Sequence, residues 1–151
     1  MRRPRGSSKL YPKLCLCECG NLVNTRNTAQ ALYASNQCQR NYEYRCFIRA
    51  WLNGEITGNA RSAGRTVSQY VRRYILERDG HKCVLCGWSQ KNPFTGTWPL
   101  VVDHIDGNSE RTIPDNLRTL CPNCDSLTPT YKGANRGRGR AARRKQHLGV
   151  K

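Results

Sequence analysis

Two pairs of cysteines in the second half of the chain have the spacing of metal ligands. Two residues separate the members of each pair, which are Cys83 with Cys86 and Cys121 with Cys124. Four thiolates so spaced can wrap one tetrahedral zinc ion, and unrelated thiols rarely fall into this pattern. Because sulfur would fill all four coordination positions, the ion would have no position for water. We therefore predict a structural zinc that closes the segment between the pairs into a loop.

The loop between the pairs, together with the residue after it, carries the residue types that hydrolyse phosphate esters. Asp103 and His104 are adjacent, Asn116 follows them, and Asp125 comes directly after the last cysteine. Neighbouring residues of a strand point to opposite faces, so Asp103 could reach a hydrolytic metal while His104 faces an attacking water. A lone histidine is more often a surface residue or a satisfied core residue. The position of His104, next to an aspartate at the end of an expected strand, favours a catalytic role.

Two short strands and a helix are expected to position these groups. Residues 100–102 are apolar and predict a strand that runs into Asp103. Residues 117–120 predict the strand that returns. Pro122 suits the first turn of a short helix that begins between the last two cysteines.

Two longer helices are predicted ahead of the loop. The first covers about residues 36–53, and Gly54 stands where a helix-ending glycine belongs. Its apolar residues recur on a single face, which favours core packing over base stacking. The second helix starts near Thr66, which makes a capping box with Gln69. Its apolar face consists of Val67, Tyr70, Val71, Tyr74 and Ile75.

The residues around the loop resemble the HNH family of nucleases, and in particular its zinc-bearing phage members. The resemblance is carried by Asp103-His104-Ile105 with Asp106-Gly107-Asn108, by Asn116-Leu117 and Leu120-Cys121-Pro122-Asn123-Cys124, and by residues 128–133. It implies a ββα-metal fold that cleaves DNA to 5′-phosphate and 3′-hydroxyl ends. In that family pattern His104 is the general base that activates water, Asp103 is a ligand of the catalytic divalent ion, and Asn116 fixes the hairpin and orients the histidine.

One position departs from the family pattern. The family places a histidine directly after the final cysteine, where this chain has Asp125. An aspartate can still bind a metal, and Asp103 with Asp125 would form an all-oxygen set that suits Mg²⁺ or Mn²⁺. We therefore expect cleavage with these ions and little cleavage with nickel.

Five further cysteines, in the first third of the chain, could ligate a second zinc ion. They are Cys15, Cys17, Cys19, Cys38 and Cys46. In an extended strand the first three, which alternate, would share one face. One-residue spacing is less usual for zinc than two-residue spacing, so buried or free thiols are an equal alternative. We take Cys15, Cys17, Cys19 and Cys38 as the candidate ligands, with any four of the five left open.

The chain is strongly basic, which favours a polyanionic partner. It has 26 Lys and Arg against 10 Asp and Glu, a net charge of +16. Counterion release on binding DNA would then contribute to affinity. The candidate DNA contacts are Arg72, Arg73, Lys132, Asn135, Arg136, Arg138 and Arg140. A solvated basic face is the alternative for the arginines of the second helix, and phosphate contacts alone would not identify a cleavage sequence.

The expected fold is a small α+β protein whose HNH core is stapled by zinc. With 151 residues and 37% hydrophobic residues, the chain can bury only a thin core without metal ligands. The expected parts are a disordered basic arm at 1–13, a Cys-rich segment with a helix at 14–54, a linker at 55–65, the nuclease domain at 66–135 and a basic tail at 136–151. Without an apolar leader or an apolar run long enough to span a bilayer, we expect reduced thiols and a cytoplasmic protein, in the host cell if a phage encodes it.

Three functions compete at this level. The first is a metal-dependent DNA endonuclease or nickase. The second is a zinc-stapled module that binds nucleic acid without cutting, in which Asp125 marks a lost site. The third is an accessory protein of phage DNA packaging or recombination machinery. The joint presence of Asp103, His104 and Asn116 favours the enzyme, because a pure binder has no need for an Asp-His pair at a strand end. The oligomeric state and the choice between nicking and double-strand cleavage stay open.

Overall fold

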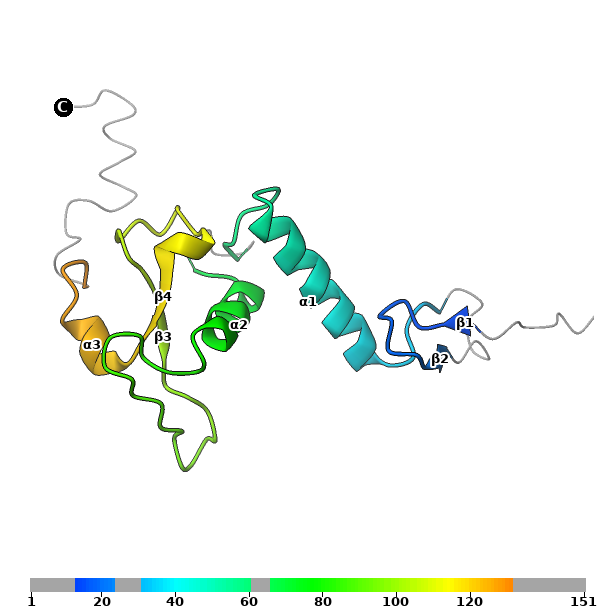
Figure 1. Cartoon of the computed structure of the whole chain (residues 1–151), viewed down its shortest axis with the longest axis horizontal. Helices are drawn as coiled ribbons and strands as arrows, with labels where there is room; N and C mark the ends of the chain where they lie inside the picture. The colour runs from blue at the N-terminus through cyan, green and yellow to red at the C-terminus, as the bar shows by residue number, and fades with distance from the viewer. Residues whose placement is uncertain (1–12, 24–30, 61–65, 132–151) are drawn as a thin grey trace, which may run out of the picture. The chain divides into compact units, whose positions relative to one another are not determined.

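A computed structural model describes residues 13–23, 31–60 and 66–131 of the chain (Figure 1). The chain divides into two units, Met1–Arg49 and Ala50–Lys151. The division falls ahead of the expected linker at 55–65. Part of that linker, most of the basic arm and all of the basic tail lie outside the described residues.

The first unit contains a small two-stranded sheet. Strand β1 (Lys13–Leu14) pairs in antiparallel fashion with β2 (Leu22–Val23). Cys15, Cys17 and Val23 form a small buried cluster. The partly buried residues that pack against this cluster are Ala31, Tyr33, Ala34, Cys38 and Tyr42. Two of the three buried members of this cluster are cysteines.

Helix α1 (Asn36–Leu52) confirms the helix expected at about residues 36–53. The hydroxyl of Ser35 accepts a hydrogen bond from the backbone N–H of Cys38 at 3.2 Å, which satisfies one free donor of the first turn. After the helix, Gly54 has a φ of 75° and donates its N–H to the carbonyl of Trp51 at 3.0 Å. A left-handed glycine at this position is a common way to end a helix.

The second unit is built on a β-hairpin. Strands β3 (Val101–His104) and β4 (Leu117–Leu120) pair in antiparallel fashion, and a 3₁₀ turn, η1 (Pro114–Asn116), leads into β4. Helix α2 (Gln69–Arg78) precedes the hairpin, and α3 (Pro122–Ser126) follows it (Figure 1). The two strands and the short helix were all expected from the sequence, and the described part of the chain is a small α+β structure.

Helix α2 packs on the hairpin through its apolar face. Val71 and Ile75 of α2 are 0% exposed, as is Thr119 of β4. The backbone N–H of Thr119 donates to the carboxylate of Asp79, at the end of α2, at 2.9 Å. The Asp79 side chain, at the C-cap of α2, therefore satisfies a backbone N–H group of β4. This hydrogen bond holds the end of α2 against the strand.

The start of α2 corrects the capping box expected at Thr66. The N-cap is Ser68, whose hydroxyl accepts the N–H of Val71 at 3.2 Å. Val67 forms an isolated antiparallel bridge with Asn59, so the backbone is still extended there and the helix cannot begin before Ser68. Tertiary pairing displaces the helix start from the position that local sequence favours.

Residues 55–60, expected as linker, belong to the second unit and pack against its other segments. The carbonyl of Gly58 accepts the N–H of Ser68 at 2.9 Å, and Trp51 Nε1 donates to the carbonyl of Thr112 at 2.8 Å. A Cβ atom at Gly58 would lie 2.6 Å from both Trp51 Nε1 and Thr112 Cγ2. Only glycine allows the backbone at position 58 to lie this close to Trp51 and Thr112. The close contact places the neighbouring Asn59 beside the loop between β3 and β4.

No helix in the described residues is long and apolar enough to cross a membrane.

Candidate active site and metal centre

The four cysteines of the second unit converge on one point. The Sγ atoms of Cys83, Cys86, Cys121 and Cys124 all lie within 4.8 Å of one another. Cys86 Sγ and Cys121 Sγ are 3.7 Å apart. With Zn–S bonds of about 2.3 Å, the sulfurs of a tetrahedral site are separated by about 3.8 Å. The cysteines therefore fit a tetrahedral metal ion.

Both ends of this cluster are set by local backbone structure. Cys121 is the N-cap of α3, and its sulfur accepts the N–H of Cys124 at 3.4 Å. In the other pair, Gly87 has a φ of 76° and donates its N–H to the carbonyl of Cys83 at 2.8 Å, which closes the turn that contains Cys86. A tight turn and a helix start thus present the two pairs to each other.

The thiols of this cluster differ in acidity. Burial raises the pKa of Cys83, but hydrogen bonds from backbone N–H groups outweigh burial and bring its pKa to about 6. Hydrogen bonds with the neighbouring thiols of Cys121 and Cys86 raise the pKa of Cys124 to about 12. The Cys83 thiol therefore ionises readily, and the Cys124 thiol does not. A bound cation would stabilise all the cysteines of the cluster as thiolates.

Asp103 pairs with an arginine that the sequence interpretation did not include. Its Oδ2 accepts a hydrogen bond from Nε of Arg118 at 2.9 Å and forms an ion pair with Nη2 of the same residue at 2.9 Å. The two residues stand opposite each other in the β3–β4 register, and their side chains are only 13% and 19% exposed. Among the described residues, Oδ1 of Asp103 has no hydrogen-bond partner, so one oxygen of this carboxylate can still bind another group.

His104 is held through its ring by a chain of hydrogen bonds. Its Nε2 lies 2.9 Å from Oγ1 of Thr112, which in turn lies 2.5 Å from Oδ1 of Asn59. Asn59 Nδ2 donates to the carbonyl of Ser109 at 3.3 Å, which orients the amide so that its oxygen faces Thr112. The Thr112 hydroxyl therefore donates to Asn59, with the carbonyl of Ser109 further away at 3.4 Å, and its oxygen accepts a hydrogen bond from the Nε2–H group of His104. This tautomer leaves Nδ1 as the basic nitrogen.

Burial lowers the pKa of His104, while the nearby carboxylates of Asp103 and Asp106 partly oppose that effect. The balance favours the neutral imidazole near neutral pH, which is the form that can accept a proton.

Asn116 fixes the loop between the strands. It is 5% exposed, and its Nδ2 donates at 2.8 Å both to Asp106 Oδ1 and to the carbonyl of Arg111. Its Oδ1 accepts the N–H of Asp106 at 3.2 Å, and its carbonyl accepts the N–H of Ile105 at 2.9 Å. Asn116 thereby holds the backbone that follows His104. The imidazole itself contacts Thr112.

Asp125 lies in α3, which contacts β3, and its side chain is half-buried. Within the described ranges, the groups of three or more side chains that could share a metal are the two cysteine clusters, so Asp103, His104 and Asp125 do not form a third. The pairing of Asp103 with Asp125 around a divalent ion stays a prediction.

The candidate DNA contacts are only partly described. Arg72 Nη2 donates to the carbonyl of Leu100 at 2.7 Å, and Arg73 pairs with Glu77 at 2.7 Å. Arg72 thus has a structural role at the start of the hairpin, whereas Arg73 is half exposed. The remaining candidates, Lys132, Asn135, Arg136, Arg138 and Arg140, lie outside the described residues.

Three site residues have no motif signal of their own. Arg118 could have been found by pairing the expected strands, because a cationic residue then falls opposite Asp103. Thr112 and Asn59 could not, because they are 53 residues apart and meet through tertiary packing.

Comparison with known proteins adds one relative. The chain is 42% identical over 81 residues to the H-N-H endonuclease F-TflIV of Escherichia phage T5. The resemblance to the HNH endonuclease family is thereby confirmed. The match covers 50% of this chain and 34% of the phage HNH protein, so this chain spans about a third of the length of the HNH endonuclease it matches. No family model matches the chain, and no solved structure matches it.

Proposed function

We propose that this chain is a metal-dependent DNA endonuclease or nickase in which His104 is the general base. The observation that carries the proposal is the hydrogen-bond chain from Asn59 through Thr112 to His104, at the end of β3. Its arrangement assigns a proton to one ring nitrogen and keeps the other as an acceptor. The phage HNH endonuclease that matches half of the chain supports the same class of reaction.

In this proposal Nδ1 of His104 takes a proton from a water molecule. The resulting hydroxide attacks the phosphorus of the scissile phosphodiester, a P–O bond forms, and the bond to the 3′ oxygen breaks. The leaving oxygen takes a proton from solvent, which yields the 5′-phosphate and 3′-hydroxyl ends that the family resemblance implies. A positioned general base of this kind contributes about 10²- to 10⁴-fold to the rate.

The catalytic divalent ion would be held by Asp103 and Asp125, with Mg²⁺ or Mn²⁺ preferred for their oxygen ligands. The free Oδ1 of Asp103 supports this assignment, as does the position of Asp125 on α3, which contacts β3. When bound, the ion would stabilise the charge that develops on the leaving oxygen. Arg118 would orient the Asp103 carboxylate and compete with the ion for it.

The metal at the cluster of Cys83, Cys86, Cys121 and Cys124 would be a structural zinc ion, because four sulfur ligands leave no position for a reacting group. By tying the start of α3 to the turn before β3, it would hold Asp125 and the hairpin in one rigid piece.

The substrate would be DNA in the cytoplasm of a host cell, bound through the excess of Lys and Arg. A second candidate function is a non-cleaving DNA-binding or packaging accessory protein. The ion pair between Asp103 and Arg118 favours this alternative, since it uses one oxygen of the proposed metal ligand.

The proposal is tested by nicking of supercoiled plasmid in the presence of Mg²⁺ or Mn²⁺, with EDTA as the blank. The natural chain should nick, and His104→Ala should lose about 10²- to 10⁴-fold of the rate. His147→Ala, the same change in the tail, is the matched control and should cut normally. If the natural chain retards the plasmid but cuts with neither ion, the non-cleaving alternative replaces the nuclease.

A further inference from the structure

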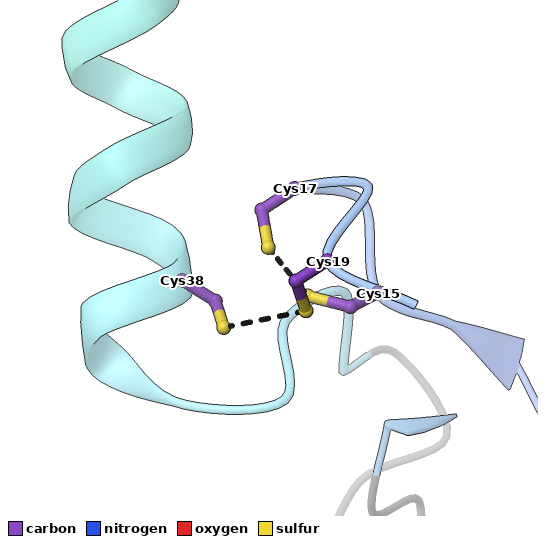
Figure 2. A group of neighbouring side chains, drawn as sticks. All are labelled: Cys15, Cys17, Cys19 and Cys38. Carbon is purple, nitrogen blue, oxygen red and sulfur yellow. Dashed lines mark hydrogen bonds between the residues drawn. The ribbon is translucent and has the colours of Figure 1, made fainter. Parts of the chain in front are cut away.

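The first unit contains a second cluster of cysteines, separate from the one in the nuclease unit. We propose that Cys15, Cys17, Cys19 and Cys38 bind one zinc ion as a tetrahedral tetrathiolate site. Three of these cysteines come from the turn between β1 and β2, and the fourth comes from the first turn of α1 (Figure 2). Figure 2 shows the four side chains pointing toward one another.

The sulfur separations fit a metal site. All four Sγ atoms lie within 4.8 Å of one another, with Cys19 and Cys38 3.8 Å apart and Cys15 and Cys17 3.3 Å apart. A tetrahedral zinc site needs about 3.8 Å between sulfurs. A disulfide would need about 2.05 Å, and all four are free cysteines. The arrangement is therefore that of metal ligands and not of a crosslink.

The backbone of the turn explains why cysteines at alternate positions can converge. The expected extended strand ends at Leu14, so these cysteines do not share one face of a strand. Instead Glu18 has a φ of 63° and Gly20 a φ of 78°. A left-handed residue other than glycine costs about 1–2 kcal/mol and persists when surrounding interactions require it. Binding of three thiols of this turn to one ion would hold the backbone in this left-handed conformation.

Hydrogen-bond donors surround the sulfurs. The backbone N–H of Ala34 donates to Cys15 Sγ at 3.2 Å, and the hydroxyl of Ser35 donates to Cys38 Sγ at 3.2 Å. Donors of this kind stabilise thiolates and fix their orientation around a metal. Arg45 of α1 also donates to the carbonyl of Cys17 at 2.5 Å, which ties the helix to the turn.

The structure distinguishes Cys38 from Cys46, which the sequence left as alternatives. Cys38 belongs to the group of four, whereas Cys46 lies two turns further along α1, is exposed and contacts Tyr42. Cys46 is therefore a matched control on the same helix.

The first unit also needs such an ion to fold. In the described residues its buried hydrophobic side chains are Cys15, Cys17 and Val23 in one cluster and Ile48 in α1, too few to offset the entropy of ordering the unit. Metal ligation is the usual source of stability for cores of this size.

The test is the number of zinc ions per purified full-length chain, measured by elemental analysis. The natural chain and Cys46→Ser should each contain two zinc ions, and Cys38→Ser one. Cys86→Ser, in the other cluster, should also contain one. After Co²⁺ substitution, the visible absorption of tetrahedral thiolate sites should fall about twofold in Cys38→Ser, while the remaining ion reports that the nuclease unit is still folded.

The proposal is overturned if Cys38→Ser holds as much zinc as the natural chain, or if Cys46→Ser loses an ion. If instead the cluster that contains Cys86 bound no zinc, the zinc contents would follow a different pattern. The natural chain would then hold one ion that Cys86→Ser keeps and Cys38→Ser loses.

Discussion

Oγ1 of Thr112 lies 2.9 Å from Nε2 of His104 and donates a hydrogen bond to Oδ1 of Asn59. Thr112 is 4% exposed, so its position is set by packing. The consequence is a histidine whose tautomer is determined by a residue outside the family motif. Thr112 is a positioning residue, because it acts on the reaction only through His104.

Thr112→Val keeps the shape of this side chain and removes the hydroxyl. We expect kcat of plasmid nicking to fall about fivefold, since a lost hydrogen bond of about 1 kcal/mol lets the ring rotate and change tautomer, while KM stays unchanged. Thr112→Ser keeps the hydroxyl and should retain most of the rate. Equal rates for the valine and serine variants, or a loss confined to KM, would contradict the positioning role.

Arg118 and the divalent ion compete for Asp103 in this account. Arg118→Gln removes a charge-assisted contact of about 1.5 kcal/mol or more, so the Mg²⁺ concentration that gives half-maximal nicking should fall about tenfold. The matched control is Arg111→Gln, which breaks the exposed ion pair with Asp106 and should leave the Mg²⁺ dependence unchanged. A requirement for more Mg²⁺ in Arg118→Gln would show that Arg118 assists metal binding.

Asp79 makes stability depend on pH. Burial raises the pKa of its carboxyl, but hydrogen bonds from Arg78 and Thr119 outweigh burial and lower the pKa overall. Because the folded-state pKa lies below the unfolded value of about 4, the contribution to stability is complete above pH 4 or so and is lost as pH falls through the folded-state pKa. Asp79→Asn should therefore lower the free energy of unfolding by about 1–3 kcal/mol at pH 7.

Urea unfolding of the natural chain and Asp79→Asn at several pH values measures this effect. The difference between their free energies of unfolding should shrink as the pH is lowered below 4. Loss of bound zinc at low pH would affect both proteins equally. Asp115→Asn, at an exposed aspartate of η1, should match the natural chain at every pH. A difference for Asp79→Asn that is independent of pH would rule out ionisation as its cause.

Local pattern predicted much of the second unit. The apolar runs at residues 100–102 and 117–120 gave β3 and β4, and Pro122 marked the start of α3. Two-residue spacing likewise identified the cluster that contains Cys83, because the two members of such a pair are brought together by a single turn.

Contacts between distant segments could not be predicted in this way. The start of α2 moved to Ser68 because Val67 pairs with Asn59. The hydrogen bond between Thr112 and Asn59 joins residues 53 apart in the sequence, which no local pattern relates. In the first unit, the choice of Cys38 over Cys46 depends on how the turn meets α1, which spacing alone does not specify.

The central claim, that His104 accepts the proton, is tested most directly by chemical rescue. Single-turnover nicking of plasmid is measured for the natural chain and for His104→Gly, each with and without added imidazole. We predict that His104→Gly loses about 10²- to 10⁴-fold of the rate and that imidazole, which can occupy the space left by the side chain, restores part of it only in this variant. Nicking by His104→Gly at the natural rate, or no response to imidazole in the variant, would contradict the account.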